Sequence, residues 1–272
     1  MKIIVCVKQV PSASEVKIDP QTKNLVRDGV PSVLNPSDVS AIESALRIKE
    51  CTGGSVTLLS MGPPQAKQAL EYGLGMGADR AVLICDRRLS GSDTLATSYA
   101  LTHQIEKEGF DLILCGNETI DGCTGQVGPS IAERLNIPGC SYVSEIAVDE
   151  GSFRLKRDTG AEYEMFEVKP PFLACLLKGS YDPRPSAPVQ REVETVDASG
   201  MELDQIGLTG SPTRVFKITR PEREQNFVDV DSSLSYEERI EVIISGGVVR
   251  KDYELVRGSA KKLADTILEA LE

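Results

Sequence analysis

The strongest constraint on the fold is an alternation of short apolar segments with longer segments of helical periodicity. Residues 2–7, 55–60, 80–85 and 112–114 are apolar runs too short for helices, and they are typical of strands buried on both faces. Segments with apolar residues at helical spacing lie between them. This order predicts right-handed βαβ units, and therefore an α/β fold with a doubly wound parallel sheet, Rossmann-like, covered by helices on both faces.

The stretch 111–135 is the most informative about a ligand. A buried strand ends at Gly116, and a loop rich in Gly and small polar residues follows it. The next helix has apolar residues four positions apart, at Val127, Ile131 and Leu135. Such a loop can present backbone N–H groups and the positive end of a helix dipole to a phosphate. An ordinary βα turn has the same pattern, so both interpretations stay open here.

Further loops rich in Gly, Asn, Asp or Pro lie near expected helix starts, at residues 8–11, 35–38, 61–64 and 90–94. Together with 116–126, four of these five loops directly follow expected strands. Ligands of parallel sheets bind beyond the carboxyl ends of the strands. The convergence favours a nucleotide site, in which Lys8 is either a solvated strand end or a phosphate ligand.

Charge and cysteine usage limit the function classes. The 272 residues include 30 Lys+Arg and 41 Asp+Glu, a net charge of −11, which argues against nucleic-acid or anionic-membrane partners. No apolar run reaches the roughly 18 residues of a membrane span, and no leader pattern follows Met1. The seven cysteines are scattered without a CxxC pair, so we expect reduced thiols, mostly in the core, in a cytoplasmic protein.

The sequence lacks the common catalytic and nucleotide fingerprints. It contains no GxGxxG after the first strand, no GxxxxGK[ST] and no GxSxG. The single histidine, His103, cannot belong to a multi-histidine metal site, and we expect it to pack or to lie at the surface. We therefore predict no catalytic side chain and no metal site, and a binding or carrier role in which a cofactor supplies the chemistry.

The pattern changes after residue 140. Residues 141–148, 153–157 and 163–168 alternate polar and apolar residues around turns, which predicts an antiparallel β-ribbon at about 141–168. Residues 172–177 form a further apolar strand. We expect a nucleotide-binding domain at 1–178 and, at 179–272, an extended arm whose last helix, about 259–271, docks on a partner.

Six segments in order resemble the β subunit of electron-transfer flavoproteins. They are Val5–Pro11, Asp28–Gly29, Asn35–Asp38, Ser60–Pro63, Met76–Asp79 and Gly116–Pro129. The resemblance covers roughly residues 1–178. It implies an obligate heterodimer with an α subunit and a nucleotide held by the loops named above.

The resemblance places nucleotide contacts on Cys6, on Asn35 to Asp38, on Met61 and on Gly116 to Val127, and the strand-end loops add Lys8, Gly62, Asp93 and Thr94. The predicted cofactor-binding residues are therefore Cys6, Lys8, Asn35, Pro36, Ser37, Asp38, Met61, Gly62, Asp93, Thr94, Gly116, Asn117, Glu118, Thr119, Ile120, Asp121, Gly122, Cys123, Thr124, Gly125, Gln126 and Val127.

The family has two types. In the housekeeping type the β subunit binds structural AMP, and the single FAD lies at the interface with α. In the bifurcating type a second FAD replaces AMP. Loop residues 121–125 are smaller and less acidic than in the housekeeping type, which leaves room for a pyrophosphate and removes repulsion. We therefore favour FAD and keep AMP as the alternative.

The bifurcating type implies a specific electron path. NADH gives a hydride to the β-subunit FAD, one electron goes to ferredoxin, and the other passes through the α-subunit FAD to an acyl-CoA dehydrogenase or a similar flavin dehydrogenase. The chain is then an electron-transfer subunit of an NADH-dependent oxidoreductase complex.

Two departures from the family pattern bear on the partners. Residues 178–190 match the family's partner-recognition loop in Asp182-Pro183-Arg184 but differ in the flanks. The tail from about residue 236 is unlike other β subunits and resembles the flavin domain of the α subunit only faintly, so we interpret it as a docking helix. A nucleotide sensor of the universal-stress type has a similar sheet, but the long arm argues against it.

Overall fold

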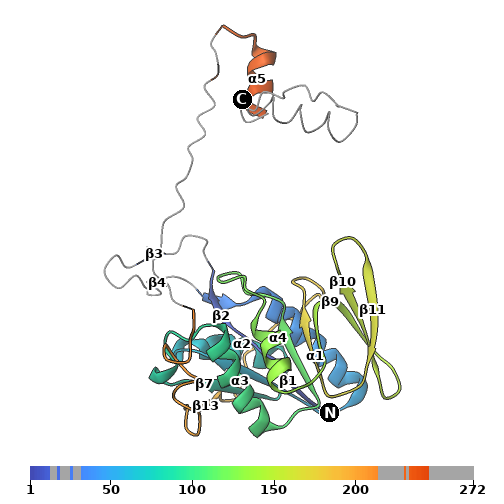
Figure 1. The fold of residues 1–272 in the computed structure, drawn as a ribbon. Helices are drawn as coiled ribbons and strands as arrows, with labels where there is room; N and C mark the ends of the chain where they lie inside the picture. Colours follow the sequence, from blue (N-terminus) through green and yellow to red (C-terminus); the bar gives the residue numbers. More distant parts are fainter. Residues whose placement is uncertain (13–16, 19–24, 27–31, 214–229, 231–232, 245–272) are drawn as a thin grey trace, which may run out of the picture. The chain divides into compact units, whose positions relative to one another are not determined.

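The computed structural model describes residues 1–12, 17–18, 25–26, 32–213, 230 and 233–244. The chain divides into two compact units, Met1–Phe216 and Lys217–Glu272, and each is described by itself. The first unit is built around a nine-stranded sheet (Figure 1).

The strands of this sheet lie in the order β11-β10-β9-β12-β8-β1-β6-β7-β13. All neighbouring pairs from β9 to β13 are parallel, whereas β10 is antiparallel to both of its neighbours, β9 and β11. The bounds are β1 (Lys2–Cys6), β6 (Ser55–Met61), β7 (Arg80–Ile84), β8 (Leu112–Gly116), β9 (Gly139–Val148), β10 (Phe153–Asp158), β11 (Tyr163–Val168), β12 (Phe172–Leu176) and β13 (Glu194–Val196). Two small sheets pair β2 (Gln9–Pro11) with β5 (Ser32–Leu34), and β3 (Lys17–Ile18) with β4 (Leu25–Val26).

Helices cover both faces of the parallel part. The longer helices are α1 (Pro36–Thr52), α2 (Lys67–Met76), α3 (Thr94–Glu108) and α4 (Val127–Arg134), and the 3₁₀ turns are η1 (Pro64–Ala66) and η2 (Arg87–Leu89). Ile3 of β1 packs in one core cluster with α1 and α2, and its neighbour Ile4 packs in the other with α3 and α4. Successive strand residues point to opposite faces, so each face has its own apolar core. The predicted α/β class with a mostly parallel sheet is confirmed.

Local sequence explains the helix ends. The Asp93 side chain accepts hydrogen bonds from the N–H groups of Leu95 (2.9 Å) and Ala96 (3.1 Å) and so caps α3. Gly53 and Gly109 follow α1 and α3 at φ +73° and +68°, which glycine adopts without strain. Asn35 occupies the predicted N-cap position of α1, but its side chain makes no capping bond. That side chain binds the loop after β8 instead.

The strand order reverses at β1. From β1 the chain moves to β6 and β7 on one side, and it then returns to β8 on the other side of β1. Ligands of such sheets bind in the crevice beyond the carboxyl ends of the strands at this switch point. The fold therefore directs attention to the ends of β1 and β8.

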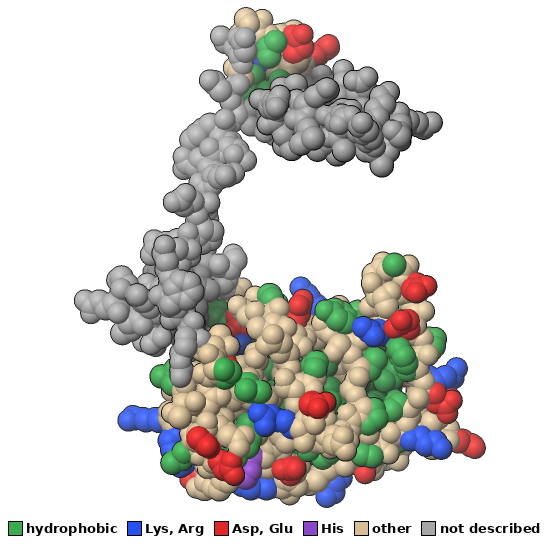
Figure 2. All heavy atoms as spheres, viewed as in Figure 1, with side chains coloured by type: hydrophobic (Ala, Val, Ile, Leu, Met, Phe, Trp, Pro, Cys, Tyr) green, Lys and Arg blue, Asp and Glu red, His purple; other side chains and the backbone are tan. Residues whose placement is uncertain are grey.

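The antiparallel strands β9, β10 and β11 confirm the predicted ribbon, with one addition. β9 also pairs in parallel with β12, so the ribbon continues the main sheet rather than standing apart. Its last strand exposes Tyr163, Met165 and Phe166, and hydrophobic side chains gather over this part of the unit (Figure 2).

Residues 179–213 belong to the first compact unit, Met1–Phe216. β13 adds a parallel edge strand to β7, and Ala198, Met201 and Ile206 are buried in the core beside α3. The sequence shows little periodicity here because these residues follow the surface of other elements. The described part of the expected arm is therefore packed on its own sheet.

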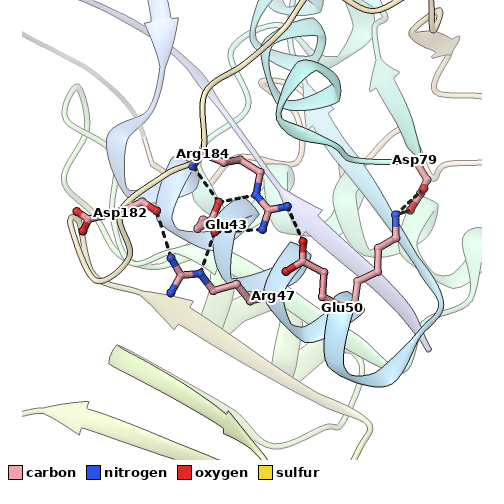
Figure 3. A network of polar contacts seen from close by, with 7 residues as sticks. Glu43, Arg47, Glu50, Asp79, Asp182 and Arg184 are labelled. Carbon is pink, nitrogen blue, oxygen red and sulfur yellow. Dashed lines mark hydrogen bonds and ion pairs between the residues drawn. The ribbon is translucent and has the colours of Figure 1, made fainter.

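We call residues 179–193 the strap, because they run along α1 and α2. Arg184 contacts Glu43 and Glu50 of α1, and Arg47 donates to the carbonyl oxygen of Asp182 at 3.4 Å (Figure 3). The Ala187 N–H donates to the carbonyl oxygen of Gly75 in α2 at 3.0 Å. The strap is thus bound to α1 and α2 at several points.

The second unit contains α5 (Tyr236–Ile244). The helix that we expect at about 259–271 lies outside the described residues. None of the helices in the described ranges is both long and apolar enough to cross a membrane.

Candidate functional site

A buried carboxylate, Asp38, lies at the switch point of the sheet. It sits in the first turn of α1 and is 4% exposed. Its Oδ2 accepts from the Lys8 N–H at 2.7 Å, its Oδ1 accepts from the Asn35 amide at 2.9 Å, and the Gly116 N–H also donates to it. One side chain therefore joins the chain just beyond β1, the start of α1 and the end of β8.

Gly116 is required by the close approach of α1. A Cβ at this position would lie 2.1 Å from Asp38 Oδ1 and 2.8 Å from the Cβ of Ser37. These distances are shorter than any van der Waals contact. Glycine at the end of β8 therefore permits the carboxylate to reach the backbone.

Asn35 carries the connection onward into the loop. Its side-chain amide donates to the carbonyl oxygen of Glu118 at 3.0 Å, and its Oδ1 accepts from the Ile120 N–H at 3.3 Å. Asn35 is fully buried. The base of the 116–126 loop is thus held by α1, which explains why this asparagine does not cap its own helix.

The tip of the same loop is exposed. Gly122, Cys123 and Thr124 are exposed, and the Asp121 side chain is partly buried at 24% exposure. Cys123 and Gly125 adopt φ values of +48° and +62°, and the Cys123 N–H donates to the carbonyl oxygen of Thr119 at 2.9 Å. A tight turn of small residues therefore stands above a buried polar base.

Lys8 and Asp121 form an ion pair between the segment after β1 and the loop, with Nζ 2.7 Å from Oδ2. Partial burial raises the pKa of Asp121, but the hydrogen bond from Lys8 outweighs it and the pKa lies below its ordinary value. The Lys8 ammonium is therefore neither a simply solvated strand end nor an unpaired phosphate ligand. An incoming phosphate would compete with Asp121 for it.

Asn117 ties the loop to the strands beyond it. Its N–H donates to the carbonyl oxygen of Leu176 in β12, and its Oδ1 accepts from the Tyr142 N–H in β9, both at 2.8 Å. The residue is 7% exposed. Its role is to anchor the loop from the ribbon side.

The loop before α3 also reaches the site. Thr94 Oγ1 donates to Gln126 Oε1 at 2.7 Å, which brings together two predicted residues from different loops. The Asp93 carboxylate caps α3 and accepts from the Thr213 N–H at 3.1 Å. Asp93 thus has structural partners, and its contact with a nucleotide stays a prediction.

The remaining predicted residues lie around these anchors. Cys6 ends β1 and is 7% exposed, Ser37 is buried, and Pro36 is the first residue of α1. Met61 ends β6 and packs against the core beside α3, and the Gly62 N–H donates to the carbonyl oxygen of Ile84. They stand at the predicted edge of the sheet, and their contacts with a ligand stay predictions.

Three cysteines form a row beneath the loop. Cys6 pairs with Cys115 and Cys115 with Cys175 in the register of β1, β8 and β12, and all three are buried, free thiols. The hydrogen bond with Cys115, together with burial, raises the pKa of the Cys175 thiol well above its usual range. Cys85 and Cys140 pack against the core as well, and only Cys51 and Cys123 are exposed, so the expectation that most cysteines belong to the core is confirmed.

Neither of two hollows in the first unit belongs to this loop. One of about 290 Å³ lies beside β2, β5 and α2, and one of about 200 Å³ lies between α4 and β9. In the described ranges no group of three or more His, Cys, Asp or Glu side chains could hold a metal ion. The candidate site is therefore the exposed loop and its buried polar base.

The sequence interpretation missed the cluster on α1 that holds the strap. The Glu43 side chain is 4% exposed and accepts from Arg47 Nε at 2.8 Å and from Arg184 Nε at 3.0 Å. The four-residue spacing of Glu43 and Arg47 was a usable signal. Arg184 lies 141 positions away, so no local pattern indicates it.

Comparisons with known proteins show the family to which the chain belongs. The family model for the electron transfer flavoprotein domain matches residues 22–201. The chain is 46% identical over 234 residues to the electron transfer flavoprotein subunit beta of Thermoanaerobacterium thermosaccharolyticum, covering 83% of this chain and 90% of that protein. It is 45% identical over 245 residues to the subunit beta of Megasphaera elsdenii (84% and 91% covered), and 42% identical over 231 residues to the caffeyl-CoA reductase-Etf complex subunit CarD of Acetobacterium woodii (81% and 88% covered). The chain belongs to the electron transfer flavoprotein family, as a β subunit.

Proposed function

We propose that this β subunit binds FAD at the 116–126 loop and accepts hydride from NADH for electron bifurcation. In this proposal one electron passes to ferredoxin and the other, through the FAD of the α subunit, to an acyl-CoA dehydrogenase or a similar flavin dehydrogenase. The alternative is a housekeeping-type subunit that binds structural AMP at the same loop.

The observation that carries the proposal is the contrast within the loop. Its base is fixed by the buried side chains of Asn35 and Asn117, and its tip, residues 121–124, is exposed and small. A nucleotide phosphate needs donors that are already in position and space without bulky or unpaired acidic side chains. In the structure the one carboxylate of the tip, Asp121, is paired with Lys8.

Several of the predicted residues have a physical task in this scheme. The backbone from Gly116 to Val127 and the start of α4 would supply donors to the phosphates, and Lys8 would supply a cation. Thr94 and Gln126 would orient the nucleotide from the α3 side. Bound FAD would supply the redox chemistry, and the protein would hold it and exclude competing groups.

The homologues also support a bifurcating assembly. One relative is named as a subunit of a caffeyl-CoA reductase-Etf complex, so an Etf subunit and a CoA-ester reductase share one complex there. We extend this association to the present chain as a proposal. The strap, which carries the Asp182-Pro183-Arg184 motif, is the candidate surface for the dehydrogenase.

Electron transfer flavoprotein β subunits pair with an α subunit, and the second unit is the candidate docking element. Its helix α5 exposes Tyr236, Ile240 and Ile243, which lie at four- and three-residue spacing on one face. An exposed apolar helix face of this kind is typical of a protein contact. The docking role that we expected for residues 179–272 is therefore proposed only for residues after the first unit.

The deciding experiment is to identify the bound nucleotides. The chain is purified with its α subunit, the nucleotides are released by denaturation, and they are quantified by chromatography. Two FAD per heterodimer would support the proposal, one FAD with one AMP would support the alternative, and absence of flavin would contradict both.

A loop variant tests the placement. A bulky acidic residue at Gly125 should expel FAD, but the φ of +62° would strain any such side chain. Gly122 is the cleaner position, since a Cβ there would meet only Thr119 Oγ1 at 3.6 Å. Gly122→Glu should lower the flavin content, and the neutral control Gly122→Gln should retain it. Equal flavin in both would place the phosphates elsewhere.

A further inference from the structure

The partners of Asp38 are all hydrogen-bond donors. They are the N–H groups of Lys8 and Gly116 and the side-chain amide of Asn35. An ionised carboxylate is purely an acceptor and can satisfy all three donors, whereas a protonated one must donate its own O–H. The observed arrangement therefore fits the ionised form, and a proton on Asp38 would displace at least one donor.

The effect of losing a donor would extend to the loop. Asp38 orients Asn35, which holds the carbonyl oxygen of Glu118 and the N–H of Ile120. Gly116, the residue on which the loop begins, is bound directly. The chain of contacts from the carboxylate to the loop base has only one intermediate side chain.

We propose that Asp38 is a positioning residue for the nucleotide: its ionised carboxylate holds the base of the 116–126 loop in the binding position, and protonation releases it. This inference rests on the proposed function only in taking that loop as the nucleotide site.

Burial of Asp38 places its titration in the neutral range. Burial raises the pKa of Asp38 to about 7, against the lowering effect of the bonds from Asn35, Lys8 and Gly116. From the segment after β1 the Lys8 ammonium acts on this carboxyl, and Asp121 of the loop pairs with that ammonium. From β8 and β12 it faces the thiols of Cys115 and Cys175, whose pKa values are also raised, so these thiols stay protonated.

The sign of the pH dependence follows. If binding requires the ionised form, nucleotide affinity falls as the pH falls through about 7. Simple repulsion between the carboxylate and a bound phosphate gives the opposite trend, with tighter binding at lower pH. The two explanations can therefore be separated by one titration.

The first test measures FAD affinity of the complete α/β complex between pH 8 and pH 6. We expect the wild type to weaken about tenfold over this range, and Asp38→Asn to bind about tenfold more weakly at pH 8 with a flat profile. FAD is the probe because the AMP phosphate itself titrates near pH 6. A flat or rising wild-type affinity toward pH 6, or an unchanged slope in Asp38→Asn, would overturn the proposal.

The second test needs no nucleotide. Amide hydrogen exchange in the nucleotide-free complex, corrected for intrinsic rates, should show that Asp38→Asn loses protection at Lys8, Gly116 and Ile120. The matched control is Asp111→Asn, because Asp111 Oδ2 accepts from the Lys2 N–H at 2.7 Å at the opposite end of β1. That variant should lose protection near Lys2 and retain FAD.

The two tests distinguish failure of this inference from failure of the proposed function. Loop amides that depend on Asp38 in a protein that binds no FAD at any pH would support the positioning role and contradict FAD binding. Normal FAD binding by Asp38→Asn, with unchanged exchange protection of the loop amides, would support FAD binding and contradict the positioning role. The wild-type pH profile remains decisive if Asp38→Asn does not fold.

Discussion

Both edges of the parallel sheet use aspartate to hold strand backbones, but in different electrostatic settings. At the amino edge Asp79, labelled in Figure 3, has two partners. It accepts from the Val56 N–H at 2.8 Å and pairs with the Lys49 ammonium at 2.7 Å. At the carboxyl edge Asp38 accepts from the Lys8 N–H at 2.7 Å, and its direct partners are neutral.

The consequence shows in the pKa values. Burial raises the pKa of Asp79, but the hydrogen bonds from Lys49 and the Val56 N–H outweigh burial, and the pKa of Asp79 lies below its usual range. For Asp38 burial has the larger effect and raises the pKa to about 7. At the amino edge the aspartate is held in its ionised form by the ion pair with Lys49, which favours folding. The carboxyl edge keeps a buried carboxyl in a costly state, which is typical of functional sites.

We expect the largest loss of stability from a substitution at Gly116, where β8 ends against α1. Gly116→Ala would place a Cβ 2.1 Å from Asp38 Oδ1 and 2.9 Å from the Asp38 nitrogen, so the end of β8 and α1 must separate. We expect a loss of about 3 kcal/mol in the free energy of unfolding, measured with urea, and loss of bound nucleotide.

Gly122→Ala is the control, because its Cβ has an open surrounding. It should change stability by less than about 0.5 kcal/mol. Equal losses of stability in the two variants would show that the end of β8 is not more rigid than the loop tip.

The Arg184–Glu43 ion pair of the strap allows us to measure how much an ion pair with one buried partner contributes to stability. Arg184→Ala would leave Glu43 with Arg47 as its remaining cation, and we expect a loss of about 2 kcal/mol, reduced because the Arg184 side chain is 31% exposed. Asp182→Ala removes an exposed side chain beside it and should change little.

The pH dependence of Arg184→Ala has a definite sign. Burial raises the pKa of Glu43, but Arg184 and Arg47 outweigh it and lower it below 4.5. The contribution of the pair is therefore present above pH 4.5 and lost as the pH falls through the lower folded-state pKa. A deficit of the variant that stayed constant down to pH 3 would contradict the assignment.

A smaller effect should separate the two aspartates directly. Asp79→Asn should cost about 1 kcal/mol at pH 7, with the difference from the wild type vanishing below pH 3.8, because the folded-state pKa is lowered. Asp38 should behave in the opposite way. Its stabilising contribution is present below pH 3.8 and is lost as the pH rises through about 7.

Urea unfolding of the wild type, Asp79→Asn and Asp38→Asn at several pH values measures both trends. If the free energies of unfolding of the two variants change with pH in the same way, the proposed difference between the two edges is wrong.

The smallest expected effect is at the α3 side of the site. Thr94→Val removes the exposed hydrogen bond to Gln126 and should lower stability by less than about 0.5 kcal/mol, while nucleotide affinity falls a few-fold. Ser92→Ala is not a suitable control, since its hydroxyl is hydrogen bonded within the same turn. Leu95→Ala is preferable, because Leu95 is 44% exposed and follows directly. A larger affinity loss in Leu95→Ala would argue against a role of the Thr94 hydroxyl.

The sequence predicted the parallel strands and the loops at their carboxyl ends, because these depend on local apolar runs and on Gly, Asn and Asp. The role of Asn35 could not be predicted in this way. Its type and position indicate a helix cap, but its side chain binds residues 118–120, which lie more than eighty positions along the chain. The same limitation applies to the strap, whose residues follow other surfaces and have no period of their own.

The position of β12 has a consequence for the order in which the chain can assemble. β12 lies between β8 and β9, although β9, β10 and β11 precede it in the sequence. The three-stranded ribbon can form by local pairing, but it can join the growing sheet only after residues 172–176 have been added beside β8. We therefore expect the ribbon to be a separate early structure during synthesis, and the insertion of one late strand to be the step that unites both halves of the sheet.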